Sequence, residues 1–313
     1  MSPYFSVVVP TYNRSNTIEA TLRSVISQTY PSFECIIVDD GSNDVVQLEQ
    51  LVASLSDPRL KIISQKNGGG GAARNTGIVN ATGKYVAFLD SDDLFHPNKL
   101  DLFHKLLEKE PHEAAYSYAR VDRGVPGRSW IRPDRPIRSD ESMARYLFIA
   151  NQFVQTSTIV METRVARRIM FDPSLRKGQD LDFCLRADVA GVRFHMLEKP
   201  LITWTDASEI GRTSRHAGAS APQAWLAAHQ HLMTKEETLG YRATVLAYYQ
   251  PKYRLLQVVR DLILGVLIAK VPVKVAARQL LRFILPRHLY RSAVALAIKL
   301  RGARADNRAE NAN

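Results

Sequence analysis

The sequence has few cysteines, with only Cys35 and Cys184 among its 313 residues. Each stands in an apolar segment, as a small core residue does. Two isolated cysteines supply neither a disulfide framework nor a cysteine-based metal site. The scarcity of cysteine therefore predicts a reducing compartment.

Long hydrophobic runs are also missing. A bilayer-spanning helix needs roughly 18 uninterrupted apolar residues, and the nearest approach, residues 262–269, ends at Lys270. The N-terminus enters a strand-like segment without the basic and apolar regions of a signal peptide. We therefore expect a cytoplasmic protein with no spanning helix.

A basic excess is absent from the first 240 residues, which carry 28 basic and 28 acidic side chains. Residues 241–313 carry 14 basic and three acidic side chains, so the whole net charge of +11 lies there. A nucleic-acid-binding protein would carry its basic residues on the folded domain, beside aromatic side chains that stack on bases. This distribution predicts no nucleic-acid partner and favours an anionic membrane surface.

The first 120 residues alternate between strand-like and helix-like patterns. Strands are expected at residues 5–9, 33–39, 60–64 and 85–89, and helices at residues 13–28, 45–55 and 72–80. This alternation predicts an α/β fold with a doubly wound parallel sheet. Ligands bind outside the carboxyl ends of the strands in such sheets.

Beyond residue 114 the alternation loosens, which predicts a mixed, mainly parallel sheet. Strands are expected at residues 114–119 and 153–161 and in two pieces within 193–204, and helices at residues 140–149, 163–169 and 179–189. We expect one α/β domain over residues 1–215. A basic amphipathic helical extension is expected over residues 216–301, and a disordered tail over residues 302–313.

Three carboxylates follow the apolar residues 86–89, namely Asp90, Asp92 and Asp93, with Ser91 among them. Such a cluster repels itself unless a cation lies within it. A Mg²⁺ or Mn²⁺ ion that bridges a diphosphate is the economical explanation, because hard oxygen ligands suit these ions. A solvated turn that caps the next helix is the alternative.

Polar or special residues also follow the other strands. Pro10, Thr11 and Asn13 follow the first strand, Asp40 follows the second, and a glycine-rich segment with Arg74 follows the third. A dinucleotide-binding loop is excluded because Arg74 stands where a third glycine is needed. A Walker loop is excluded because no Gly-Lys-Ser/Thr follows.

The order and spacing of these four motifs resemble the family 2 glycosyltransferases of bacterial exopolysaccharide and cell-surface glycan synthesis, which have the GT-A fold. The resemblance covers roughly residues 4–205. It implies a metal-dependent, inverting transfer of one sugar from a nucleotide-diphosphate sugar to a hydroxyl of a glycan acceptor. Family frequency suggests a UDP-hexose such as UDP-glucose as the donor.

The resemblance also implies roles for residues at the sheet edge. Asp40 matches a carboxylate that accepts hydrogen bonds from the base or ribose, with an Asx-turn or helix cap as the alternative. Asp92 matches the ligand of Mg²⁺ or Mn²⁺, and Asp93 is a supporting or substrate-facing carboxylate, with a helix cap as the alternative. The residues implied for nucleotide-sugar binding are Pro10, Thr11, Asn13, Asp40, Arg74, Asp90 and Ser91.

The catalytic base implied by the resemblance is Asp180, at the start of a predicted helix. Gln179 replaces the glutamate that usually precedes it, and Asp182 is the alternative base. Many relatives carry Arg-x-His after the last strand. His216 is the candidate for that role here, and Trp204 is a candidate for stacking on a sugar.

The acceptor and its location are suggested by basic segments. Six arginines within residues 120–138 could clamp a phosphate. Residues 253–267 and 273–300 intersperse aliphatic and basic residues at helical spacing, as helices in a membrane interface do. A polyprenyl-diphosphate-linked glycan at the inner face of the cell membrane would suit both features, and a homodimer-forming helical tail is the alternative.

Two other functions compete with glycosyl transfer. A sugar nucleotidyltransferase shares the general architecture, but its glycine-rich basic loop should follow the first strand. A noncatalytic nucleotide-sugar-binding membrane scaffold would not need the acidic residues that are retained here. Processive synthesis is rejected, because Asp261 stands where Gln-x-x-Arg-Trp requires tryptophan.

Overall fold

A computed structural model describes residues 2–122, 124, 129–205, 219–286 and 289–290. His216 and the predicted tail at residues 302–313 lie outside the described residues. The chain divides into two compact units. Unit 1 comprises Met1–Arg123, Trp130–Asp140 and Phe153–Thr213, and unit 2 comprises Gly124–Ser129, Glu141–Gln152 and Ser214–Asn313.

Unit 1 is built on one mixed sheet with the strand order β3-β2-β1-β4-β8-β6-β9-β5, in which β7 pairs with β6. The strands are β1 (Phe5–Thr11), β2 (Phe33–Asp39), β3 (Leu60–Ser64), β4 (Tyr85–Phe88), β5 (Leu94–Phe95), β6 (Ala114–Asp122), β7 (Ser129–Arg132), β8 (Val160–Glu162) and β9 (Phe194–Thr205). Strands β1 to β4 are mutually parallel, as are β6 and β9, whereas β8 is antiparallel to both β4 and β6. The predicted mixed, mainly parallel sheet is therefore confirmed.

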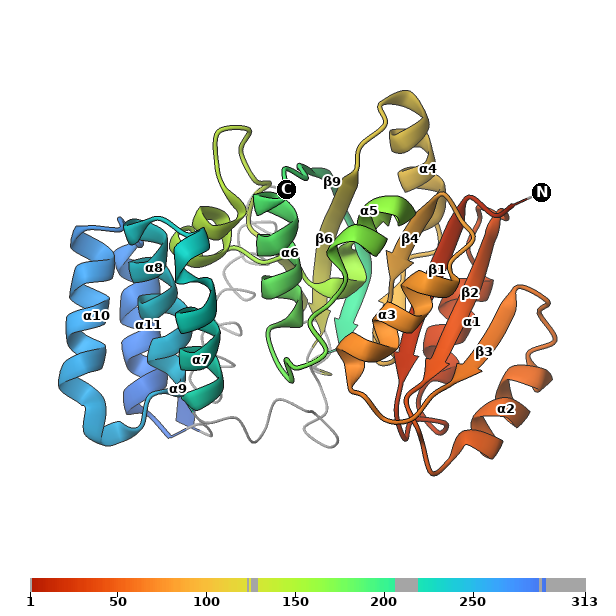
Figure 1. The fold of residues 1–313 in the computed structure, drawn as a ribbon, viewed down its shortest axis with the longest axis horizontal. Coiled ribbons are helices and arrows are strands. Elements are labelled where there is room, and N and C mark those ends of the chain that lie inside the picture. The colour runs from red at the N-terminus through yellow and green to blue at the C-terminus, as the bar shows by residue number, and fades with distance from the viewer. Residues whose placement is uncertain (1, 123, 125–128, 206–218, 287–288, 291–313) are drawn as a thin grey trace, which may run out of the picture. The chain divides into compact units, whose positions relative to one another are not determined.

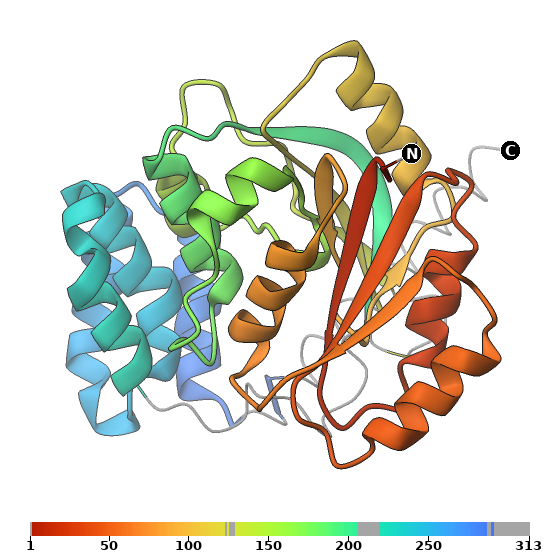
Figure 2. The ribbon, with the colours of Figure 1, turned by 45° about the vertical axis from the view of Figure 1, so that its right-hand side comes forward.

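Helices cover both faces of this sheet. They are α1 (Glu19–Ile26), α2 (Val45–Ser54), α3 (Gly70–Asn80), α4 (Lys99–Lys109), α5 (Thr163–Ile169) and α6 (Gln179–Val189). Alternate residues of β1 point to opposite faces, so Val7 joins a core with α1 and α4 while Val8 packs against α3. Figure 2 shows the strands between α3 on one side and α1 on the other.

Glycine at position 77 permits the close packing of α3 on β1. A Cβ atom there would lie 2.3 Å from Cγ1 of Val8, which is well inside van der Waals contact. The α3 helix can therefore lie directly on the strand, and its N-terminal end is held at the carboxyl edge of the sheet. This edge is where parallel α/β sheets bind ligands.

One expected strand of unit 1 is much shorter than predicted. Residues 153–161 were expected to form a strand, but a short turn at Thr156–Thr158 precedes β8. Gln155 causes the turn, because its side-chain Oε1 accepts the N–H of Ser157 at 2.8 Å and its carbonyl accepts the hydroxyl of Thr158 at 2.6 Å. Local side-chain hydrogen bonds thus override the strand preference of the β-branched residues.

Unit 2 is helical. It contains two short π-helices, Arg145–Ile149 and Arg242–Leu246. Its α-helices are α7 (Ser220–His229), α8 (Lys235–Tyr241), α9 (Ala247–Tyr249), α10 (Leu255–Leu267) and α11 (Val273–Ile284). Val258 and Leu262 of α10 share a buried core with Val275 and Phe283 of α11. The expected C-terminal helices are present (Figure 1).

The division into units differs from the expected domain ranges at two internal segments, Gly124–Ser129 and Glu141–Gln152. Residues 141–152 were expected to belong to the first domain, but they form part of unit 2. The side chain of Ser142 bonds Glu237, and the hydroxyl of Thr244 donates to the carbonyl of Phe148 at 3.0 Å. The roles assigned to the ranges 1–215 and 216–301 stay predictions.

Candidate functional site

The carboxyl ends of β1, β2 and β4 lie side by side, because these strands are parallel neighbours. The loops that follow them are joined by hydrogen bonds. The N–H of Asp40 donates to the carbonyl of Thr11 at 2.9 Å, and the N–H of Asn43 donates to Oδ1 of Asn13 at 2.8 Å. Asn13 has a left-handed backbone, with φ of 52°. It therefore bridges two loops, and it lies five residues before the N-cap of α1, Ile18.

Three buried oxygens at this edge have no hydrogen-bond partner among the described residues. They are Oγ1 of Thr11, Oδ1 of Asp39 and Oδ1 of Asp44. A buried polar atom without a partner costs free energy, about 1–3 kcal/mol. Ligand groups that donate a hydrogen bond would remove this cost, which agrees with the assignment of Thr11 to a binding pocket. Pro10 is buried at the end of β1.

The carboxylate of Asp40 is buried and binds the glycine-rich segment. Its Oδ1 accepts the N–H of Gly68 at 2.8 Å and Nε2 of Gln65 at 2.7 Å, and its Oδ2 accepts the N–H of Gly69 at 2.7 Å. Asp40 thus fixes the loop that leads into α3, and it does not cap α2. Its contact with a base or ribose stays a prediction.

Arg74 lies buried at the centre of the site. Its Nη2 bonds Oδ1 of Asp90 at 2.5 Å, and its Nη1 donates to Oε1 of Gln179 at 2.5 Å. Gly70 makes room for this arrangement, because a Cβ atom there would lie 3.2 Å from Nη1 of Arg74. The guanidinium therefore links the carboxyl end of β4 to the first turn of α6.

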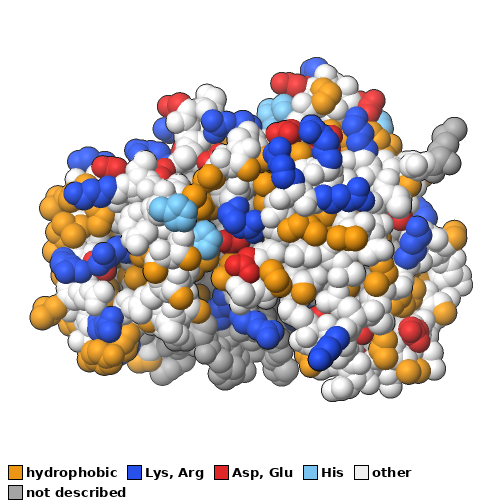
Figure 3. Space-filling model, in the orientation of Figure 1, with side chains coloured by type: hydrophobic (Ala, Val, Ile, Leu, Met, Phe, Trp, Pro, Cys, Tyr) orange, Lys and Arg blue, Asp and Glu red, His pale blue; other side chains and the backbone are white. Residues whose placement is uncertain are grey.

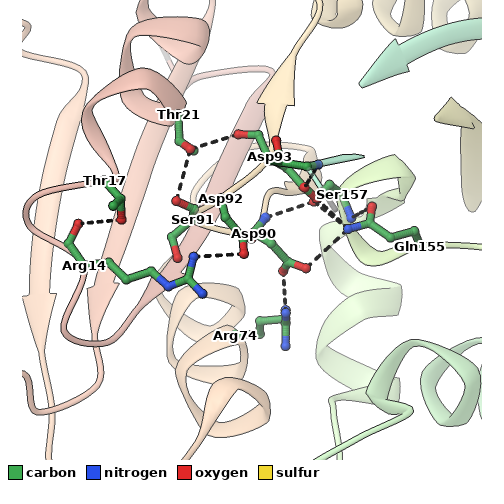
Figure 4. A network of polar contacts seen from close by, with 11 residues as sticks. Arg14, Thr17, Thr21, Arg74, Asp90, Ser91, Asp92, Asp93, Gln155 and Ser157 are labelled. Carbon is green, nitrogen blue, oxygen red and sulfur yellow. Dashed lines mark hydrogen bonds and ion pairs between the residues drawn. The ribbon is translucent and has the colours of Figure 1, made fainter. Parts of the chain in front are cut away.

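The Asp-x-Asp segment is held by two arginines (Figure 4). Asp92 pairs with Arg14 at 2.9 Å and keeps 38% of its side chain exposed. Asp90 pairs with Arg74 and keeps 27% exposed. The carbonyl of Ser91 accepts the hydroxyl of Thr21 at 3.2 Å, and the Ser91 side chain is buried.

Asp93 is fully buried and faces the protein interior rather than a ligand. Its Oδ2 accepts Nε2 of Gln155 and the hydroxyl of Ser157, each at 2.6 Å. Its Oδ1 accepts the N–H of Thr205 at 3.2 Å. Burial, and then the charges of Asp90 and Asp92, raise the pKa of this carboxyl well above its ordinary value. Asp93 is therefore a supporting carboxylate and not a helix cap.

Asp180 occupies the first turn of α6, which follows Gly178 in a left-handed backbone with φ of 66°. Its Oδ1 accepts the N–H of Leu181 at 2.9 Å. Burial raises the pKa of Asp180 to about 6, with a further contribution from the charge of Asp90. Asp180 therefore lies close enough to Asp90 and Arg74 for their charges to affect its ionisation.

Asp182 does not reach this site. It is fully buried and pairs with Arg186 one turn later, with 2.6 Å between Nη2 and the carboxylate. Arg186 also donates to the carbonyls of Ile169 and Met170 at 2.6 and 2.7 Å. The alternative assignment of Asp182 as the base is thus wrong, because the carboxylate is part of a buried structural ion pair.

Trp204 lies near the end of β9 and stacks on Phe153, with 5.1 Å between the ring centroids. One face of its ring is therefore already used in packing. Its contact with a sugar stays a prediction.

Asp90 and Asp92 could hold a divalent metal only if a bound ligand supplied further oxygen atoms to it. Among the described residues, no group of three or more His, Cys, Asp or Glu side chains could hold a metal ion. Mg²⁺ is commonly bound by one or two carboxylates together with phosphate oxygens and water. Asp92 and Asp90 supply hard oxygens of this kind, and Arg14 and Arg74 balance their charge.

Comparison with known proteins places this geometry in context. The model of the family "Glycosyl transferase family 2" matches residues 6–172. The chain is 38% identical to the amylovoran biosynthesis glycosyltransferase AmsB of Erwinia amylovora, over 76% of this chain and 82% of that protein. It is 34% identical to the putative colanic acid biosynthesis glycosyl transferase WcaA of Escherichia coli, over 59% of this chain and 66% of that protein.

Two solved structures share the fold. Staphylococcus aureus TarS 1–349 in complex with UDP-GlcNAc matches with a TM-score of 0.62 and 20% identity, over 98% of this chain and 92% of that chain. The mannosyltransferase PcManGT from Pyrobaculum calidifontis, in complex with GDP-Man and Mn²⁺, matches with a TM-score of 0.53 and 18% identity, over 95% of this chain and 81% of that chain. At this identity the likeness concerns the fold alone.

Proposed function

The chain belongs to glycosyl transferase family 2, and on this premise we propose that it transfers one sugar from a nucleotide-diphosphate sugar to a hydroxyl of a glycan acceptor, with inversion at the anomeric carbon. The observation that carries the proposal is a chain of contacts from Asp90 through Arg74 to Gln179, which brings the first turn of α6, and with it Asp180, to the Asp-x-Asp segment. Burial raises the pKa of Asp180 there to about 6. A general base works best when its pKa lies near the operating pH. Asp180 is then ionised at neutral pH yet basic enough to accept a proton.

The proposed reaction is a direct displacement at the anomeric carbon. Asp180 takes the proton of the acceptor hydroxyl as that oxygen attacks the anomeric carbon from the side opposite the diphosphate. The bond between the anomeric carbon and the diphosphate oxygen breaks, and the nucleoside diphosphate leaves with the electron pair. Arg74, which pairs with Asp90, would offer positive charge to the departing diphosphate.

A divalent metal would be held by Asp92, with Asp90 in its surroundings. When bound, Mg²⁺ or Mn²⁺ supplies Lewis-acid stabilisation of the leaving diphosphate. The carboxylates of Asp92 and Asp90 provide the hard oxygen ligands for it, and Arg14 is close enough to Asp92 to compete for the same oxygen. The Mn²⁺ in the complex of PcManGT supports this assignment.

The donor is proposed to be a UDP-hexose, such as UDP-glucose. The pocket for the nucleoside would be formed by Pro10, Thr11 and Asn13 with Asp40. The unpartnered hydroxyl of Thr11 supports a ligand at this position. TarS and PcManGT share this fold and are in complex with UDP-GlcNAc and GDP-Man, which supports a nucleotide-diphosphate sugar as the ligand.

The proposed acceptor is a growing glycan on a polyprenyl diphosphate, used in bacterial surface or exopolysaccharide synthesis. AmsB is an amylovoran biosynthesis glycosyltransferase, which supports this class of product. A lipid-linked acceptor requires the enzyme to work at the inner face of the cell membrane. Unit 2 carries the surface that suits this location.

One face of α10 in unit 2 is apolar and exposed. Leu256, Ile263 and Leu267 are 86%, 51% and 63% exposed, and their spacing places them on one side of the helix. Figure 3 shows hydrophobic side chains gathered over α10, with basic side chains beside them. Exposed apolar patches mark interaction sites when they are contiguous.

The charged residues around the exposed apolar face of α10 are almost all basic. Within residues 252–286, Asp261 is the sole acidic residue, and it is buried and paired with Arg242. Each basic residue near an anionic bilayer contributes about 1 kcal/mol. Among the described residues, no helix combines the length and apolar character needed to cross a bilayer. We therefore propose peripheral binding to anionic phospholipid.

A screen of nucleotide sugars tests the proposed activity. Purified protein is incubated with UDP-, GDP- and dTDP-sugars, and release of nucleoside diphosphate is followed with Mn²⁺, with Mg²⁺ and with EDTA. Metal-dependent release of nucleoside diphosphate from one class of donor is expected. Release of pyrophosphate from a sugar phosphate and a nucleoside triphosphate would instead identify a nucleotidyltransferase, and no turnover would favour a noncatalytic scaffold.

Sedimentation with vesicles tests the membrane surface. Binding to phosphatidylcholine vesicles is expected only when they contain phosphatidylglycerol, and Leu256→Glu with Ile263→Glu should abolish it. Val46→Glu, on an equally exposed valine of α2 in unit 1, is the matched control. A homodimer in light scattering that the α10 substitutions dissociate would show that a second copy covers this face and would overturn the membrane assignment.

A further inference from the structure

Gln155 lies in the short turn before β8, in a segment where the sequence indicated no functional residue. Its side chain is buried, and its Oε1 accepts the N–H of Ser157 at 2.8 Å. This bond fixes the orientation of the side-chain amide. The opposite orientation would put the amide oxygen against two carboxylates. The NH₂ group therefore points toward the Asp-x-Asp segment (Figure 4).

The NH₂ group of Gln155 faces two carboxylates and one hydroxyl. Its Nε2 lies 2.6 Å from Oδ2 of Asp93, 3.2 Å from Oγ of Ser157 and 3.3 Å from Oδ2 of Asp90. An amide supplies two donors, so one group can satisfy both acids. It thereby separates two like charges that would otherwise face each other without a donor between them.

Ser157 holds the backbone of the same segment. Its hydroxyl accepts the N–H of Asp90 at 2.9 Å and donates to Oδ2 of Asp93 at 2.6 Å. Lys99 anchors the turn from the interior, because its buried Nζ donates to the carbonyl of Ser157 at 2.5 Å. Lys99 thus fixes the backbone of the turn, and the turn holds the Gln155 amide in place against Asp93 and Asp90.

The geometry points to Gln155 as a positioning residue for Asp90, an inference that rests on the proposed function. Arg74 holds Oδ1 of Asp90, and Gln155 holds Oδ2. With both oxygens restrained, the carboxylate presents a single orientation to the donor and its metal. Displacement of a binding group by about 1 Å can cost on the order of 100-fold in rate. Loss of the Gln155 amide should therefore slow turnover without unfolding unit 1.

Gln155→Met is the informative variant, because methionine keeps the length of the side chain and removes its hydrogen bonds. The matched control is Gln28→Met. Gln28 is buried in unit 1 to the same degree and also makes hydrogen bonds with three partners, the carbonyls of Ser24 and His96 and the N–H of Leu100. Both variants lose a buried amide, but only Gln155 touches Asp90. Gln155→Glu is a second variant, which adds a third carboxylate beside Asp90 and Asp93.

Two measurements are compared among these variants. Hydrogen exchange of peptides that cover residues 88–93, in the absence of any ligand, reports the order of the Asp90 segment. We expect faster exchange there in Gln155→Met than in Gln28→Met. Turnover of the donor per folded molecule should fall roughly 10- to 100-fold in Gln155→Met, should fall further in Gln155→Glu, and should be unchanged in Gln28→Met.

The outcomes separate this inference from the proposed function. Equal exchange at residues 88–93 in both methionine variants would overturn the positioning role, whether or not the protein turns over a donor. Where the wild type turns over a donor, equal turnover in both variants would also overturn it. Faster exchange in Gln155→Met, together with a wild-type protein that turns over no nucleotide sugar, would support the positioning of Asp90 and refute the glycosyl transfer.

Discussion

Arg74 and Gln179 join two helices that lie about a hundred residues apart in sequence, with Nη1 of Arg74 2.5 Å from Oε1 of Gln179. The residue before Asp180 is thus in contact with the cation that pairs with Asp90. An uncharged amide at this point leaves the positive charge of Arg74 to be balanced by Asp90 alone. The charge at position 179 therefore bears directly on the ionisation of Asp180.

Gln179→Glu should shift the pH dependence of turnover. A second carboxylate next to Asp180 disfavours its ionised form and raises its pKa above the present value of about 6. Because the base must be ionised, the rising limb of kcat/KM should move to higher pH. Gln47→Glu, on the exposed side of α2, is the control and should leave the profile unchanged. An unshifted profile in Gln179→Glu would argue against Asp180 as the titrating base.

Asp92→Ala should remove metal-dependent binding of the nucleotide. Asp92 is the more exposed carboxylate of the Asp-x-Asp pair, and its loss leaves Arg14 without its partner. Calorimetric titration with UDP or GDP in the presence of Mn²⁺ should lose its signal, as it should after treatment of the wild-type protein with EDTA. Asp101→Ala, in the exposed pair with Lys105, is the control. Unchanged heats in Asp92→Ala would refute the role of this carboxylate.

Asp180→Asn should stabilise the folded protein at neutral pH. The folded-state pKa of about 6 exceeds the ordinary value of 3.8. Between these values the folded state binds a proton that the unfolded state lacks, so wild-type stability falls as the pH rises through this interval. Asparagine has no charge to bury, so it should raise the free energy of unfolding by about 1–3 kcal/mol above pH 6. The range allows for solvent screening, because Asp180 is only half-buried.

Urea unfolding at two pH values measures this effect. The stability gain of Asp180→Asn should be present near pH 7.5 and should be mostly lost near pH 4, where the carboxyl is protonated in the folded state and close to half protonated in the unfolded state. Asp101→Asn, at an exposed site, should show no such pattern. A gain that is equal at both pH values would mean that burial does not raise the pKa of Asp180.

The sheet and its ligand-binding edge could be predicted from the sequence because they depend on local patterns. The strands Phe33–Asp39 and Leu60–Ser64 and the helix Gln179–Val189 have the expected bounds. Each combines a regular apolar period with residues that end the element. The placement of Asp40 and Asp90 at the same edge of the sheet followed from parallel topology. The proximity of Asp180 to Asp90 followed from the family resemblance.

Contacts between distant segments could not be predicted in the same way. The role of Gln155 depends on two carboxylates more than 60 residues away, and its turn interrupts a segment whose composition favours a strand. Asp182 and Asp180 are alike in sequence, but Arg186 pairs with Asp182 one helical turn later. A search for basic residues four positions after each acid could have identified that pair.

The central claim is that Asp180 acts on the acceptor proton and not on donor binding. The most direct measurement compares Asp180→Asn with the wild type in metal-dependent turnover of the nucleotide sugar and in calorimetric affinity for it. Turnover should fall by about 10²- to 10⁴-fold, the usual contribution of a general base, while the dissociation constant stays nearly the same. Retained turnover, or a loss of affinity as large as the loss of turnover, would contradict this account.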